Sequence, residues 1–364
     1  MFSVIAAHAS VVQPILIYPA SFMFVDMFFV ISGYLITTII LQERESTGRV
    51  SLRAFYVRRF ARLYPVIVVA LAVMIISGLL RPDSPATPSW LYVAGSGLYF
   101  ANFVAIANHA DAVSAWISLW SLSIEEQFYA VWPIVLLWTI KKGHRLRVPL
   151  LLVSALTLAM WSWRSWSFHR VITTTYPDAG EHLMNLASGW HSFEYSTFQR
   201  PDGLLIGCAL ALLLARPASR SARLLISTAR RARLPAIVII VAIVAATRGG
   251  AAWQVYWGLG LFNICIALLL ADLLTSQDSY LSRFLGLRAF VWIGRRTYFM
   301  YVIHLAVFTF AFEVLGLTTL PEIALIVLVI FALSGFSYRY YENPIRKWGY
   351  RVSGRSIARE NTTP

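Results

Sequence analysis

The feature that most constrains this chain is a series of apolar segments, each close to the roughly 20 residues needed to cross the hydrocarbon core of a bilayer. Only 13% of the residues are charged, against about 25% in a typical soluble domain. The sequence therefore predicts an all-α, polytopic helical bundle in a lipid bilayer. We expect about ten transmembrane helices, at residues 1–20, 22–41, 64–80, 124–140, 148–167, 202–215, 235–247, 253–270, 297–315 and 322–340.

The distribution of positive charge predicts the orientation of this bundle. Of the 31 Lys and Arg residues, 25 fall between alternate pairs of crossings, in residues 42–63, 141–147, 216–234, 271–296 and 342–364. Loops rich in Lys and Arg remain cytoplasmic. We therefore expect a multi-pass protein of the cell (plasma) membrane with both termini in the cytoplasm. The net charge of +14 is then a topology signal, and we expect no nucleic-acid partner.

One apolar segment, residues 91–107, does not fit the alternation of crossings between the two faces of the membrane. If it crossed alone, the basic loops on either side would lie on opposite faces of the membrane. We expect it to re-enter the membrane or to lie along the outer interface, where irregular backbone is tolerated beside protein or water. We expect one transmembrane domain over 1–350, with its first helix incomplete at its start, and a polar cytoplasmic tail over 351–364. No metal site is expected, since Cys208 and Cys265 form no ligand pattern.

Ionisable side chains inside apolar segments are costly and need a partner or a function. His8 could bond a neighbouring helix, or act as a general base near neutral pH. Asp26 could pair structurally or orient a histidine. Glu125 and Glu126 begin a crossing, where a helix N-terminus favours carboxylates; we expect Glu125 at an outer site. His304 is a further candidate for substrate binding, with packing as the alternative.

Two groups of charges flank other crossings. Arg58, Arg59 and Arg62 lie within about one helical turn of each other, and guanidinium groups bind phosphate in bidentate geometry. They could bind an anionic nucleotide, or act as topology anchors and lipid contacts. Arg200 and Asp202 could pair with each other or reach the outer cavity.

Taken together, these motifs resemble the membrane acyltransferase-3 family. The most specific piece is Trp120-Ser-Leu-Ser-Ile-Glu-Glu-Gln-Phe-Tyr129. The other pieces, in the order of the family, are His8, Val25-Asp-Met-Phe-Phe-Val-Ile-Ser-Gly33, Phe55-Tyr-Val-Arg-Arg-Phe-Ala-Arg-Leu-Tyr-Pro65, Arg200-Pro-Asp202, Gly294 to His304 and Glu342-Asn-Pro344. Together they cover nearly the whole chain.

The resemblance implies an integral membrane O-acyltransferase. The donor would be acyl-CoA, most simply acetyl-CoA, and the acceptor a hydroxyl of a carbohydrate, glycolipid or macrolide. His8, Asp26 and Glu125 are the expected catalytic residues, and Arg58, Arg59 and Arg62 the expected donor ligands. We expect the acceptor to contact Trp120, Ser121, Glu126, Tyr129, Arg200, Asp202 and His304.

One departure leaves alternatives open. The family carries an arginine eleven residues before its first-span histidine, and here that position would precede Met1. The chain could therefore be a truncated, catalytically impaired member of the family. A proton-coupled transporter or flippase is the other alternative, because buried ionisable residues also relay protons.

Overall fold

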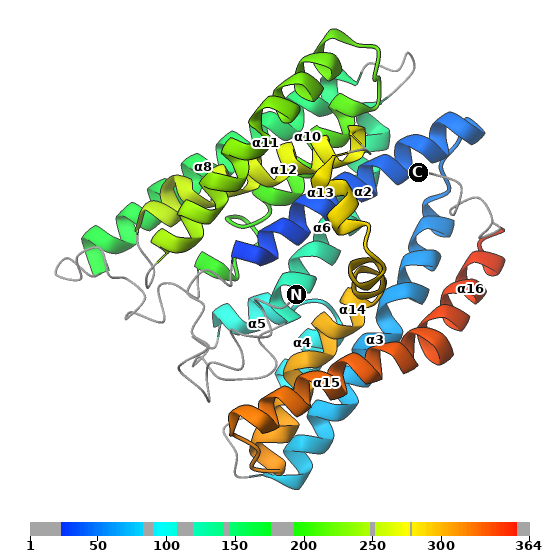
Figure 1. Cartoon of the computed structure of the whole chain (residues 1–364), viewed down its shortest axis with the longest axis vertical. Helices are drawn as coiled ribbons and strands as arrows, with labels where there is room; N and C mark the ends of the chain where they lie inside the picture. Colours follow the sequence, from blue (N-terminus) through cyan, green and yellow to red (C-terminus); the bar gives the residue numbers. More distant parts are fainter. Residues whose placement is uncertain are drawn as a thin grey trace.

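The computed structural model describes residues 23–82, 90–107, 119–140, 146–175, 193–247, 252–276 and 279–354. Within these ranges every regular element is a helix, and none of the described residues lies in a strand. The all-α prediction is therefore confirmed for this part of the chain (Figure 1).

The described residues form the following helices, in chain order. The first half contains α2 (Met23–Thr47), α3 (Leu52–Leu80), α4 (Trp90–Gly97), α5 (Ala101–Ala107), α6 (Trp120–Thr139) and α8 (Arg147–Thr175). The second half contains α10 (Asp202–Leu214), α11 (Arg220–Ala246), η4 (Gln254–Gly258), α12 (Leu259–Thr275), α13 (Tyr280–Leu285), α14 (Arg288–Thr309), η5 (Phe310–Val314), α15 (Leu320–Ser337), η6 (Tyr338–Glu342) and α16 (Asn343–Val352). The three η elements are π-helical turns that continue neighbouring α-helices.

Among the described residues, six helical segments are long and apolar enough to cross a membrane by length and composition. They are Met23–Thr47, Leu52–Leu80, Arg147–Val171, Gln254–Thr275, Arg288–Val314 and Leu320–Val352. α10 is apolar but shorter. A membrane bundle is therefore supported by six candidate spans, whereas the count of ten stays a prediction and the first predicted crossing lies outside the described residues.

The segment that was expected not to cross alone forms two short helices. α4 has 8 residues and α5 has 7, so each is about 12 Å long or less at 1.5 Å per residue. Between them Tyr99 adopts a φ of 60°. Neither helix can span the roughly 30 Å hydrocarbon core, and the re-entrant path itself stays a prediction.

Glycines bring α2 and α10 into close contact. A Cβ atom at Gly33 would lie 1.9 Å from the carbonyl oxygen of Leu204, and one at Gly207 would lie 2.1 Å from that of Val30. Small residues allow this approach between membrane helices. Gly33 and Gly207 therefore serve close packing between α2 and α10.

α2, α6 and α10 run in the same direction. Ser32 bonds Glu125, and five residues further along α2 the Thr37 hydroxyl accepts the indole N–H of Trp132 at 2.9 Å. The glycines of α10 likewise face successive turns of α2. All three helices therefore begin on the same side of the bundle.

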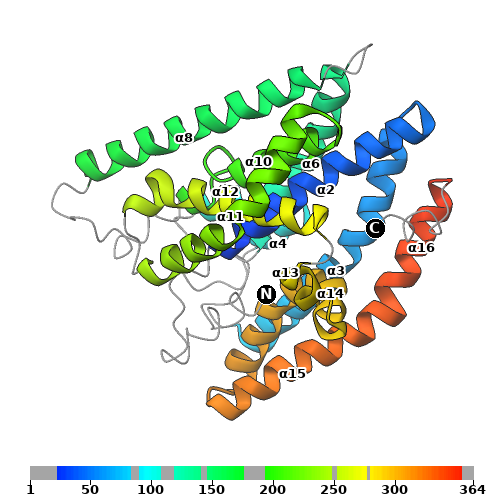
Figure 2. The same cartoon turned by 45° about the horizontal axis from the view of Figure 1, so that its top comes forward.

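Two hydrophobic core clusters of the described residues lie on either side of α2 and α6, and two further clusters include residues of both of these helices. The first cluster lies among α3, α14 and α15, and the second lies among α2, α10, α11 and α12. Figures 1 and 2 show α8 along the edge of the second cluster, while α15 and α16 lie along the edge of the first. Charged residues on α2 and α6 are therefore enclosed between these two clusters.

Candidate functional site

Two buried ion pairs lie at the junction of α2, α8 and α10. Asp26 Oδ2 accepts from Arg200 Nη2 at 2.8 Å, and Asp202 Oδ2 accepts from Arg164 Nη1 at 3.0 Å. None of the four side chains is exposed. Each buried ion gives up its hydration, so such pairs are maintained only by good geometry and further hydrogen bonds. The bundle therefore concentrates four charges at one point of its interior.

Aromatic side chains support these pairs. The Trp161 indole N–H donates to Asp202 Oδ2 at 2.7 Å, and the guanidinium of Arg200 lies 5.5 Å from the ring centre of Trp120 in a cation–π contact. The predicted pairing of Arg200 with Asp202 is wrong. Because the two side chains leave the start of α10 in different directions, Arg200 reaches α2 whereas Asp202 reaches Arg164 on α8.

A second charged cluster joins α3 to α6. Arg59 Nε donates to both carboxylate oxygens of Glu126 at 3.0 and 3.2 Å, and its Nη2 donates to Oε1 at 2.7 Å. The same Nη2 lies 3.8 Å from Oε1 of Glu125. The guanidinium also lies 3.2 Å from the ring centre of Tyr129. Arginine–carboxylate contacts of this kind are directional, so Arg59 is held in one orientation.

This cluster shows that it was wrong to place Glu125 across the membrane from the arginines. α3 begins at Leu52, well before the apolar run, because the Ser51 hydroxyl caps it by accepting the Ala54 N–H at 3.2 Å. Arg59 therefore lies two turns inside a helix. α6 also begins before the predicted crossing, so Glu125 lies inside the bundle too, and the two side chains meet there.

Glu125 is also bound by two hydroxyl groups. Its Oε1 accepts from the hydroxyls of Ser32 and Tyr129. Along α2, Asp26 and Ser32 are about 9 Å apart at 1.5 Å per residue. The two charged clusters therefore lie about two helical turns from each other.

A third polar group lies where α14 meets α6. The hydroxyls of Ser121 and Tyr301 share a hydrogen bond, and Nδ1 of the buried His304 lies 2.5 Å from the Tyr301 carbonyl oxygen. A carbonyl oxygen only accepts, so Nδ1 of His304 carries the proton. Its Nε2 is then the basic nitrogen of a neutral imidazole.

The three arginines that were expected to bind a donor differ in whether they form ion pairs within the protein. Arg58 Nη2 donates to Glu43 Oε2 at 3.2 Å, and Arg59 is paired with Glu126. Arg62 is exposed and has no carboxylate within 4.0 Å among the described residues. Of the three, Arg62 keeps its charge available to a ligand.

Sequence reasoning missed several polar partners of the site. Arg164 falls within the predicted crossing 148–167, and an arginine in an apolar segment is itself a signal of a buried partner. Gln127 lies beside the two glutamates, and no sequence signal indicates the partners of its side chain. Its Nε2 donates to Asn102 Oδ1 at 2.9 Å and to the Tyr99 carbonyl at 2.8 Å, and its Oε1 accepts from the Thr197 hydroxyl at 2.8 Å. This network fixes α5 against α6.

The phenol of Tyr99 lies close to the Glu126 cluster. Burial, and after it the Glu126 carboxylate, raise the pKa of this phenol above its ordinary value, so the phenol remains protonated.

His8 lies outside the described residues, and its role as a base stays a prediction. Within the ranges that the structure describes, no group of three or more His, Cys, Asp and Glu residues is arranged to hold a metal ion.

A family model with the description "Acyltransferase domain", that of the acyltransferase-3 family, matches residues 1–339. The chain belongs to the acyltransferase-3 family. The resemblance inferred from the motifs is therefore confirmed.

Curated members of the acyltransferase-3 family are similar over almost the whole chain. Peptidoglycan O-acetyltransferase OatA of Listeria monocytogenes is 30% identical, over 90% of this chain and 52% of its own length. Putative peptidoglycan O-acetyltransferase YrhL of Bacillus subtilis is also 30% identical, over 92% of this chain and 52% of its own. This chain therefore spans about half the length of these relatives. No solved structure matches it significantly.

Proposed function

We propose that this acyltransferase-3 chain is a membrane O-acyltransferase, which moves an acetyl group from acetyl-CoA to a hydroxyl of a carbohydrate acceptor. The observation that carries this proposal is the buried Asp26–Arg200 pair beside the Arg59–Glu126 cluster. The names of the relatives support acetyl as the group transferred and a cell-wall sugar as the acceptor. Glycolipid and macrolide hydroxyls are the alternative acceptors.

In this mechanism His8 accepts the proton of the acceptor hydroxyl, whose oxygen attacks the thioester carbonyl carbon. The carbon–sulfur bond then breaks, and the sulfur of CoA takes the proton from His8, so that CoA leaves as a thiol and the imidazole becomes neutral again. Oδ1 of Asp26 is buried and receives no hydrogen bond of standard geometry from the described residues, although the side chain of Asn263 interacts with this carboxylate. Since buried acceptors are normally satisfied, we assign it to orient the His8 ring. Arg200, fixed by the other oxygen, supplies positive charge for the developing oxyanion.

The remaining residues would position the acceptor and the donor. The acceptor lies against the polar side chains of α6, the start of α10 and α14, which are Trp120, Ser121, Glu125, Glu126, Tyr129, Arg200, Asp202 and His304. Arg62 contacts the donor, whereas Arg58 and Arg59 act through their paired glutamates, holding α3 in place. We assign the donor to the basic, cytoplasmic side of the bundle.

The test is acetyl transfer from labelled acetyl-CoA in membranes that contain the full chain. A His8→Ala variant should lose about 10²- to 10⁴-fold in rate, which is the usual contribution of a general base. Arg231→Gln changes an exposed arginine of α11 and should keep the wild-type rate. A His8→Ala variant with wild-type turnover would remove His8 from the mechanism. Net solute movement without release of CoA would instead favour the transporter.

A further inference from the structure

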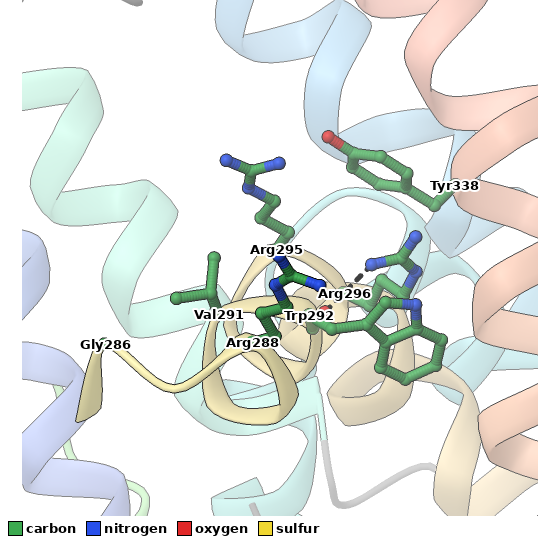
Figure 3. A pocket seen from close by; sticks show the side chains of 7 residues that line it. All are labelled: Gly286, Arg288, Val291, Trp292, Arg295, Arg296 and Tyr338. Atoms are coloured by element: carbon green, nitrogen blue, oxygen red, sulfur yellow. Dashed lines mark hydrogen bonds between the residues drawn. The ribbon is translucent and has the colours of Figure 1, made fainter. Parts of the chain in front are cut away.

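A pocket rich in arginine opens at the start of α14, away from the charged clusters described above. Its volume is about 370 Å³, and its lining comprises Gly286, Arg288, Val291, Trp292, Arg295, Arg296 and Tyr338 (Figure 3). Tyr338 belongs to η6, and Gly286 precedes α14. Elements that are distant in sequence therefore form the pocket together.

One arginine of this pocket is held rigidly by its neighbours. The guanidinium of Arg296 lies 4.1 Å from the ring centre of Trp292 and 4.6 Å from that of Tyr338. Its Nη1 also donates to the Trp292 carbonyl at 2.9 Å. An arginine held between two rings loses little further rotamer freedom when it binds an anion. The aromatic side chains therefore prepare Arg296 for a ligand.

The three arginines of the pocket form no ion pair with the described part of the protein, and the carboxylate of Glu342 acts on Arg296 only from beyond 4.0 Å. Among those residues no carboxylate lies within 4.0 Å of Arg288, Arg295 or Arg296. Arg288 is also the first residue of α14, and Leu287 provides no side-chain cap. A helix N-terminus carries partial positive charge, so a cation there is unfavourable. Arg288 at this terminus, together with Arg295 and Arg296 about two turns further along α14, therefore forms a site that favours an anion.

The pocket lies on the helix that leads to the proposed site. α14 carries Arg296 and, eight residues later, the buried His304, which is about 12 Å along the helix axis. Arg296 and Arg62 both act electrostatically on the carboxylate of Glu342. Arg62, which is exposed and has no carboxylate within 4.0 Å among the described residues, therefore lies near the same carboxylate as Arg296.

We propose that this pocket binds the phosphate groups of the acyl-CoA donor, through Arg288, Arg295 and Arg296. The assignment rests on the proposed donor and says where its charged end is held. CoA carries a phosphate monoester, with a charge of about −1.5 to −2 near neutral pH, and a diphosphate. Several arginines match that set of charges. A phospholipid with one phosphodiester group would leave most of them uncompensated.

The test is a titration of CoA into the full chain in nanodiscs of neutral phosphatidylcholine, followed by calorimetry. Arg288→Gln and Arg295→Gln change exposed side chains, and each should weaken CoA binding about tenfold, since charge-assisted contacts to phosphate are the stronger class of hydrogen bond. Arg231→Gln is the matched control and should bind as the wild type does. Dephospho-CoA should bind the wild type more weakly than CoA does.

The outcomes separate this proposal from the proposed function. If the wild type binds CoA and the two pocket variants bind it equally well, the pocket is not the donor site. If those variants instead lose phosphatidylglycerol that co-purifies with the wild type, the pocket holds a lipid headgroup and the assignment falls. If the wild type binds no CoA in the phosphatidylcholine nanodiscs, the donor itself was wrongly chosen.

Discussion

At the scale of single residues, Asp26 and Arg200 form a buried ion pair, and removing either charge alone should lower the free energy of unfolding. Asp26→Asn leaves Arg200 as a buried cation without its counter-charge, which typically costs about 3–5 kcal/mol. We expect a lower thermal unfolding midpoint in detergent and no acetyl transfer. Adding Arg200→Gln removes the uncompensated charge, so the double variant should recover part of the midpoint.

The double variant separates structure from chemistry. If the pair only holds α2 to the start of α10, restored stability should bring restored transfer. If Arg200 also stabilises charge during the reaction, the double variant should fold and remain inactive. Transfer at the wild-type rate by a folded double variant would contradict the catalytic role.

The two adjacent glutamates are predicted to differ. Glu126 receives three short contacts from Arg59, whereas Glu125 lies 3.8 Å from it and is bound by hydroxyls. Glu126→Gln should therefore lower the unfolding midpoint more than Glu125→Gln does. We expect Glu125→Gln to act mainly on the KM for the acceptor. Equal midpoints for both variants would show that the Arg59 contact adds no stability.

The residues of the site could be found from the sequence, but their partners could not. A charge in an apolar run is visible, and Asp26, Glu125 and Glu126 were identified in this way. Which cation meets which anion depends on helix direction and on where each helix begins. Arg59 and Glu126 are 67 residues apart in sequence, and only the early start of α3 brings them together.

At the scale of the helices, adding a single methyl group at Gly33 should disturb the contact between α2 and α10. A Cβ at Gly33 would lie 1.9 Å from a backbone oxygen, which cannot move aside without displacing α10. Gly33→Ala should therefore lower the unfolding midpoint and separate the ion pairs at the start of α10. Gly294→Ala is the control, since no atom lies within 4 Å of its added Cβ. An unchanged midpoint for Gly33→Ala would mean that the helices are not in close contact.

Helix ends show what hydropathy can and cannot predict. Each of the last nine predicted crossings overlaps a helix of the structure, because a run of apolar residues is needed to face lipid. Hydropathy does not report the polar turns that extend a helix beyond the apolar run. The basic first turns of α3 and α11 were therefore missed, although Ser51 and Ser219 are ordinary N-cap residues at both starts.

At the scale of the whole molecule, the orientation of the bundle can be tested with introduced cysteines, because both native cysteines are buried. α2 and α10 run in the same direction, so Glu45→Cys and Ala218→Cys, near their ends, should face the same side. The distribution of Lys and Arg predicts that this side is cytoplasmic. Both thiols should therefore react with an impermeant maleimide only after the cells are permeabilised. Arg81→Cys, at the opposite end of α3, should react in intact cells. Reaction of Glu45→Cys in intact cells would show that the bundle has the opposite orientation. The arginine pocket would then lie on the side of the membrane without acetyl-CoA.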